Sequence, residues 1–273
     1  MKTECQSPPR FFVSIPHSGE KVPSFCTWLQ HLPEPVLMRD VDRFVDQLYT
    51  PYLQKMKIPT VLTQWHRYAA DLNRLPQDID AGTVQGSPLP AGKFSRGFHW
   101  SITTLNETLM NQPLTQEIHQ QLVQLIYEPF HQEIRQQYQN FFLMNSKPVY
   151  HLDLHSMPSM GTKEHRDPGQ KRADVVISDS HGKACSEQFR KLVIQSYEQA
   201  GFHVAYNWPY YGGRVTEQYG HPDKHQHVMQ VELNRCLYMN EETKQARKDL
   251  WPSLQMKLDQ ALQSIYEGIH ELD

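Results

Sequence analysis

The chain has 273 residues with a formal net charge of −3, and 38% of its residues are hydrophobic and 11% aromatic. A chain of this composition can bury a large core and is not expected to be disordered. Its net charge gives no surplus of basic residues of the kind that binds nucleic acid. We expect no membrane partner, because the sequence has no apolar run of ~18 residues and no apolar N-terminal signal segment. Its four cysteines match no metal or redox spacing, which favours a cytoplasmic protein with free thiols.

Predicted strands and helices alternate along the sequence. Short apolar runs predict strands within 11–19, 60–66, 147–156, 173–179, 203–207 and 227–234. Helical spacing of apolar residues predicts helices within 39–56, 114–142, 186–201 and 241–272, with a kink at Pro129 and an interruption near Trp251 and Pro252. The alternation predicts one α/β domain over residues 1–273, with helices on both faces of a sheet.

Residues 76–113 are rich in Gly, Pro and Asn and form a long excursion between predicted elements. Ordered loops of this length often cover functional sites, so we expect this segment to cover part of one. In α/β proteins, ligands bind and catalytic residues lie where the strands of the sheet end in loops.

Polar residues with ligand or catalytic chemistry follow the ends of the predicted strands: His17 and Glu20; Arg67, Asp71, Asn73 and Arg74; His155; Glu232. A hydrolytic zinc site needs about three protein ligands and one open position. A His-x-x-Glu pair and a distant histidine would supply that set. Glu232, an isolated acid among apolar neighbours, is the candidate for the group that moves the proton. His151 and His155 alternate along one strand face, so spacing alone allows either as the ligand.

Seven segments occur in the order typical of one family: "VSIPHSGEKVP", "DVDRFVDQLY", "RYAADLNR", "DLHSMPS", "ADVVISDSHG", "YYGGRVTEQYGHP" and "MQVELNRCLYM". Over roughly residues 11–240 the chain resembles the N-formylglutamate amidohydrolase family. That family looks related to zinc carboxypeptidases and to aspartoacylase. The resemblance implies a three-layer α/β/α fold with a central mixed, mostly parallel sheet, similar to the zinc carboxypeptidases.

The resemblance also assigns roles to residues. His17 and His155 would hold one Zn²⁺ ion, and the ligand set of N and O atoms alone allows other divalent metals as well. His151 drops out because the family histidine directly precedes Ser156. The carboxylate ligand stays open: the wider carboxypeptidase motif points to Glu20, and the closer family points to Asp40 in "RDVD".

Three further roles concern the substrate and the proton. Asn73 and Arg74 match the pair that grips a substrate carboxylate in the aspartoacylase-like relatives, and Arg67 would extend this clamp. Glu232 would be the general acid and base.

One segment departs from the family pattern. In "GGRVTEQYG", family members commonly carry an Arg where Glu217 stands, so Arg214 would have to supply that charge from a shifted position. Gly212 and Gly213 indicate a tight turn beside the site.

We therefore expect zinc-dependent hydrolysis of a small-molecule N-acyl amino acid. N-formyl-L-glutamate, giving formate and L-glutamate as in histidine breakdown, is the leading substrate. The alternatives are hydrolysis of another N-acyl amino acid or a peptide C-terminus at the same site, and a non-catalytic homologue that binds a metal or an amino acid. The sequence leaves the oligomeric state open.

Overall fold

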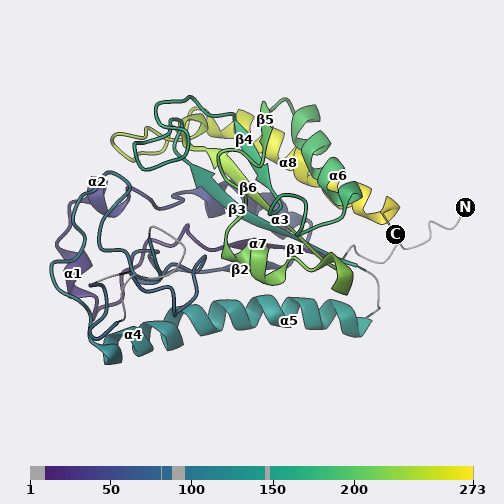
Figure 1. The fold of residues 1–273 in the computed structure, drawn as a ribbon. Coiled ribbons are helices and arrows are strands. Elements are labelled where there is room, and N and C mark those ends of the chain that lie inside the picture. Colours follow the sequence, from purple (N-terminus) through teal and green to yellow (C-terminus); the bar gives the residue numbers. More distant parts are fainter. Residues whose placement is uncertain (1–9, 81, 88–95, 145–147, 273) are drawn as a thin grey trace, which may run out of the picture.

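A mixed sheet forms the centre of the molecule (Figure 1). The computed structural model describes residues 10–80, 82–87, 96–144 and 148–272, and within these the sheet has six strands in the order β2-β1-β3-β6-β4-β5. β2, β1, β3 and β6 run parallel, β4 pairs antiparallel with β6, and β5 runs parallel to β4. The predicted mixed, mostly parallel sheet is confirmed. The strands are β1 Phe11–Ile15, β2 Thr60–Leu62, β3 Val149–Met157, β4 Val175–Ser178, β5 Val204–Tyr206 and β6 Gln226–Asn234.

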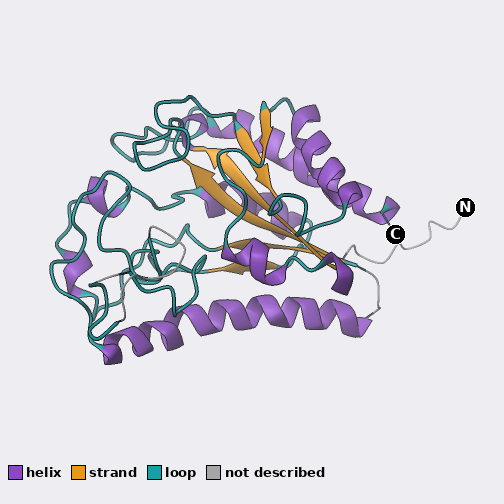
Figure 2. Cartoon of the chain, viewed as in Figure 1, coloured by secondary structure: helices purple, strands orange, loops and turns teal. Residues whose placement is uncertain are grey.

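Helices cover both faces of the sheet, so the described chain has three layers (Figures 1 and 2). α3, α6 and α8 lie on one face, and α5 and α7 lie on the other. The helices are α1 Thr27–Gln30, α2 Glu34–Leu37, α3 Val45–Lys55, α4 Gln116–Leu122, α5 Glu128–Met144, α6 Glu187–Gln199, α7 Arg214–Tyr219 and α8 Trp251–Gly268.

Two hydrophobic cores follow from the alternation of side chains along the strands. Phe11, Val13 and Ile15 of β1 pack into the core under α3, α6 and α8, whereas Phe12 packs into the core under α5. Strands that are buried on both faces are mostly apolar, which explains the short apolar runs in the sequence.

Three helical segments differ from the predictions or add to them. Within the helix predicted over 114–142, α4 continues through a π-helical turn, Val123–Tyr127, into α5 just before Pro129, where a kink is predicted. Proline lacks an N–H and crowds the preceding turn, and we infer that the wider π turn before it relieves this conflict. α8 begins only at Trp251, with Pro252 in its first turn, where a missing N–H costs nothing. Residues 214–219 form α7.

Cys26, Cys185 and Cys236 are free thiols, while Cys5 lies outside the described residues. In the part of the chain that the structure describes, no helix has the length and apolar character needed to cross a membrane.

Candidate active site and metal centre

The candidate site lies at the carboxyl ends of the parallel strands β1, β3 and β6. His17 follows β1 by two residues, and His155 of β3 stands opposite Glu232 of β6 in the strand register. The site opens into a cavity of about 740 Å³ that His17, His155 and Glu232 line. This is the sheet edge that the sequence predicted. The described part of residues 76–113 contributes Arg96 and Trp100 to the cavity wall.

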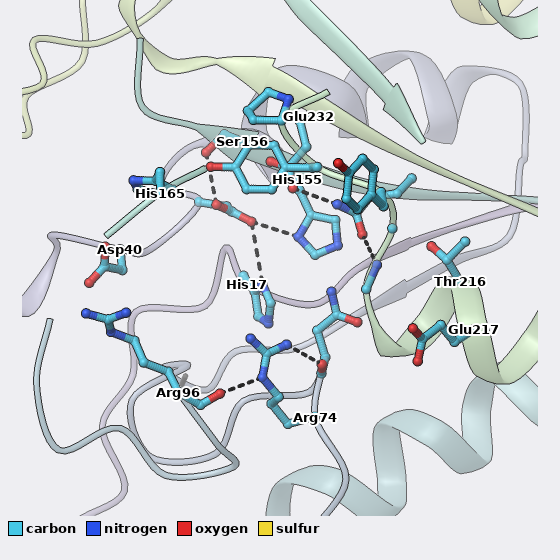
Figure 3. A pocket seen from close by; sticks show the side chains of 18 of the residues that line it. His17, Asp40, Arg74, Arg96, His155, Ser156, His165, Thr216, Glu217 and Glu232 are labelled. Atoms are coloured by element: carbon cyan, nitrogen blue, oxygen red, sulfur yellow. Dashed lines mark hydrogen bonds and ion pairs between the residues drawn. The ribbon is translucent and has the colours of Figure 1, made fainter. Parts of the chain in front are cut away.

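Two histidines and one aspartate converge at the base of this cavity. His17, Asp42 and His155 each offer one ligand atom, and these three atoms lie within 4.8 Å of one another. Asp42 Oδ2 is 3.6 Å from His17 Nδ1 and 3.1 Å from His155 Nδ1. The three residues are 1%, 1% and 3% exposed. The two imidazole rings lie beside one another in Figure 3, with centroids 4.9 Å apart.

The orientation of both histidines is set by carboxylates behind them. His17 Nε2 donates to Asp71 Oδ1 at 2.8 Å, and His155 Nε2 donates to Asp153 Oδ2 at 2.8 Å. Each ring therefore turns its Nδ1 atom toward Asp42. Carboxylates in this position fix the tautomer of a metal-binding histidine and raise its basicity.

The donor set fits a metal ion. Two imidazole nitrogens and one carboxylate oxygen form a ligand set that zinc accepts while keeping a further position open. The buried Nδ1 atom of His17 has no hydrogen-bond partner, as expected for a ligand atom.

Asp42 uses its second oxygen for a different contact. Oδ1 accepts hydrogen bonds from Arg235 Nη2 at 3.0 Å and from Ser156 Oγ at 3.1 Å. Burial alone would raise the pKa of Asp42, but its contacts with His155 and His17 and the charge of Arg235 hold this pKa well below its usual range. Asp42 is therefore an anionic group with one oxygen left for a ligand role.

The carboxylate beside the histidines is thus neither of the two expected residues. Glu20 forms an ion pair with Arg43 at 2.8 Å on the rim of the molecule. Asp40 accepts hydrogen bonds from Tyr68 Oη at 2.6 Å and Thr104 Oγ1 at 2.5 Å. In the described residues Asp42, and not Glu20 or Asp40, lies beside the two histidines. The motif "RDVD" contained both aspartates, but only the turn into α3 decides which of them reaches the histidines.

His151 does not belong to the metal cluster. Its Nε2 atom lies 2.7 Å from Ser14 Oγ, and Ser14 in turn donates to Asp153 Oδ1 at 2.5 Å. His151 therefore contacts Asp153 through Ser14, and Asp153 in turn orients His155.

Glu232 is buried close to the cluster and labelled in Figure 3. Burial raises the pKa of Glu232, and the Asp42 carboxylate adds to the rise against the opposing charges of His155 and Arg235. Gln230 Nε2 donates a hydrogen bond to Glu232 Oε1 at 2.8 Å. A buried carboxylate with a raised pKa beside these three residues is suited to accept and return a proton.

Three of the four residues expected to bind substrate line the cavity: Asn73, Arg74 and Arg67. Arg214 is not among the lining residues, whereas Gly213 and Glu217 on either side of it are. Arg74 donates to two main-chain carbonyls, Arg96 O at 2.6 Å and Asn73 O at 2.8 Å. Asn73 Oδ1 accepts from Val215 N at 2.8 Å, so this oxygen already has a protein partner.

Two of the expected clamp arginines form ion pairs with protein carboxylates. Arg67 pairs with Asp71 at 2.9 Å. Arg214 lies 3.5 Å from Asp78 and 3.3 Å from Glu217. Their charges are therefore at least partly neutralised.

Comparisons with known proteins show which family the chain belongs to. A model of the N-formylglutamate amidohydrolase family matches residues 10–239. The N-formylglutamate deformylase of Pseudomonas putida is 27% identical over 259 residues, which cover 93% of this chain and 91% of that protein. The enzyme of the same name from Pseudomonas aeruginosa is 24% identical over 260 residues, covering 93% and 91%.

Solved structures show the same fold. The crystal structure of N-formylglutamate amidohydrolase from Ralstonia eutropha JMP134 superposes with a TM-score of 0.83 at 26% identity, over 98% of this chain and 97% of that chain. The gene product Atu2144 from Agrobacterium tumefaciens has a TM-score of 0.66 at 17% identity, over 94% and 92%, which supports the fold alone. Because the family model matches most of its length, the chain belongs to the N-formylglutamate amidohydrolase family and is an amidohydrolase.

Proposed function

We propose that this chain hydrolyses the amide bond of N-formyl-L-glutamate, with one zinc ion held by His17, Asp42 and His155. The observation that carries the proposal is the buried cluster of these three residues beside Glu232, at the base of a cavity lined by arginines. The relatives named N-formylglutamate deformylase support the choice of substrate.

The proposed reaction needs a nucleophile, a proton carrier and a clamp. When bound, zinc supplies a Lewis acid that polarises a carbonyl and makes water acidic near neutral pH. Glu232 takes a proton from the water that attacks the formyl carbon, and then delivers it to the nitrogen as the carbon–nitrogen bond breaks. Formate and L-glutamate leave, and Glu232 returns to its starting state.

The substrate must be held so that its formyl group lies next to the metal site and Glu232. Asn73 has an amide nitrogen and Arg74 a guanidinium to offer to carboxylates, and both line the cavity. Fixing the carboxylates turns a two-molecule encounter into a reaction within one complex.

The test is formate release from N-formyl-L-glutamate by purified protein, with zinc measured in the same sample. We expect release that a chelator abolishes and added zinc restores. A protein that holds about one zinc ion but releases no formate would exclude this substrate.

Glu232→Gln tests the proton carrier. Because glutamine cannot take up a proton, we expect turnover to fall by roughly 10²- to 10⁴-fold while the zinc content stays unchanged. Glu187→Gln, which changes an exposed acid on α6, is the matched control and keeps wild-type turnover. Near-normal turnover of a zinc-loaded Glu232→Gln variant would refute the role.

A second candidate function keeps the chemistry and changes the substrate. The observation that favours it concerns Arg214, which forms ion pairs with Asp78 and Glu217 and is not among the residues that line the cavity. Arg214 therefore offers little positive charge to a side-chain carboxylate of the substrate. Comparing kcat/KM for the formyl, acetyl and succinyl derivatives of glutamate, glutamine and aspartate separates the two. A preference for glutamine over glutamate would favour the second.

A further inference from the structure

Gln230 stands two residues before Glu232 on β6, and residues at this spacing project to the same side of a strand. The side chain is 3% exposed, and both polar atoms of its amide have partners. Its Oε1 accepts a hydrogen bond from Gly213 N at 2.7 Å, and its Nε2 donates to Glu232 Oε1 at 2.8 Å. One amide therefore joins the main chain at the start of α7 to the carboxylate of the proposed acid and base.

The partners determine which way this amide faces. A main-chain N–H can only donate, so the oxygen of Gln230 must face Gly213. The NH₂ group must then face Glu232, which has to present an oxygen that accepts. A proton on Oε1 of Glu232 could set its O–H against the N–H of Gln230 and would compete with that hydrogen bond.

We propose that Gln230 is a positioning residue that keeps Oε1 of Glu232 as an acceptor, so that Oε2 is the oxygen that receives and returns the proton. Gln230 acts through its hydrogen bonds to Glu232 and to the main chain of Gly213. The assignment of Oε2 as the oxygen that carries the proton rests on the proposed function, in which Glu232 is the acid and base. During the reaction, the proton leaves the attacking water for Oε2 and passes from Oε2 to the leaving nitrogen, while Oε1 keeps its hydrogen bond throughout.

The other end of the network leads to the proposed substrate clamp. Two residues after Gly213, the main-chain nitrogen of Val215 donates to Asn73 Oδ1 at 2.8 Å. A Cβ atom on Gly213 would lie 1.9 Å from Asn73 Nδ2, so the main chain here packs directly against Asn73. The segment 213–215 is thus held by Asn73 on one side and by Gln230 on the other. A ligand that holds Asn73 in place also holds the loop that orients Glu232.

Two variants separate the donor from the acceptor function of Gln230. Gln230→Met keeps the length of the side chain and removes both hydrogen bonds. Gln230→Glu keeps an acceptor for Gly213 but replaces the donor to Glu232 with a second carboxylate. Gln226→Met, at a part-buried position four residues earlier on the same side of β6, is the matched control.

The measurements are kcat and KM for N-formyl-L-glutamate, zinc content, and crystal structures of the wild type and each variant. Loss of a hydrogen bond to a charged group should lower kcat by about 10- to 100-fold in both Gln230 variants. KM should change by less than about threefold, because the substrate clamp remains. Zinc content and the control variant should match the wild type. In the crystal structures, the Glu232 carboxylate should rotate away from its wild-type position.

Two results would overturn the proposal. Wild-type kcat in Gln230→Glu alongside a loss in Gln230→Met would show that Gln230 only supports the loop. An unmoved Glu232 carboxylate in both variant structures would show that Gln230 does not position it. If the wild type itself releases no formate, the proposed function fails, and the crystal structures still decide whether Gln230 positions Glu232.

Discussion

Asp42 divides its two oxygens between two contacts. Oδ2 faces the Nδ1 atoms of His17 and His155, and Oδ1 is held by Arg235 and Ser156. Because Oδ1 is fixed by hydrogen bonds, Oδ2 is presented in one position. The geometry of this single side chain therefore sets where a metal ion would bind.

Removing the charge of Asp42 should weaken the metal site more than removing any nearby acid. We expect Asp42→Asn to lower zinc affinity by at least about 100-fold. Loss of a residue that only hydrogen-bonds to a metal ligand typically lowers metal affinity by about 10- to 100-fold, and loss of a ligand itself should lower it at least as much. Zinc affinity is measured by competition with a chromophoric chelator. Asp40→Asn and Glu20→Gln are the controls and should keep the wild-type affinity within about tenfold. A larger loss in either control than in Asp42→Asn would return the ligand role to the residue concerned.

At the scale of elements, the segment that leads into α7, Gly212 and Gly213, lies against the candidate site. Gly212 has φ of +109°, a left-handed conformation that favours glycine, and Gly213 packs against Asn73. Side chains from two other parts of the chain, Gln230 and Asn73, accept the N–H groups of Gly213 and Val215. This short helix is therefore positioned by the site residues.

Adding one methyl group at Gly213 should disturb both partners. In Gly213→Ala the new Cβ would lie 1.9 Å from Asn73 Nδ2, so either the loop or Asn73 must move. We expect kcat/KM to fall by more than about tenfold, together with a stability loss of about 1–3 kcal/mol. Gly86→Ala, where φ is +72° and nothing lies within 4 Å, should cost about 1 kcal/mol without changing kcat/KM. Equal kcat/KM in the two variants would show that the close packing at Gly213 is irrelevant to the site.

At the scale of the whole molecule, several histidines are buried in neutral form away from the metal cluster. Burial lowers the pKa of His66 and His99 to about 3 and that of His131 to about 4. His131 Nε2 donates to Leu72 O at 3.0 Å, and its Nδ1 lies 2.9 Å from Tyr219 Oη. A neutral ring satisfies both partners.

These histidines should make the fold sensitive to acid. Their pKa values are lower in the folded state than the ~6.5 of an unfolded chain, so the unfolded state binds more protons below pH ~6.5. Stability is therefore present above pH ~6.5 and is lost as the pH falls toward the folded values. His131 alone should account for about 2 kcal/mol lost between pH 7 and pH 5.

Urea unfolding of metal-free wild type and His131→Gln at pH 7 and pH 5 measures this loss. The variant should lose about 2 kcal/mol less than the wild type between the two pH values. The same loss in both proteins would show that His131 is not the residue responsible.

The sequence by itself determined the periodic features and the family. Apolar runs identified β1, β3 and β6 because strands buried on both faces are mostly apolar. The ordered motifs identified His17, His155 and Glu232 as site candidates. Only the tertiary structure decided that Asp42, rather than Asp40 or Glu20, meets the histidines, because the turn before α3 sets that direction. The contacts of Arg235 with Asp42 and of Gln230 with Gly213 also appear only in the tertiary structure. They join residues far apart in the sequence, and no local pattern marks a contact that depends on how strands and loops pack together.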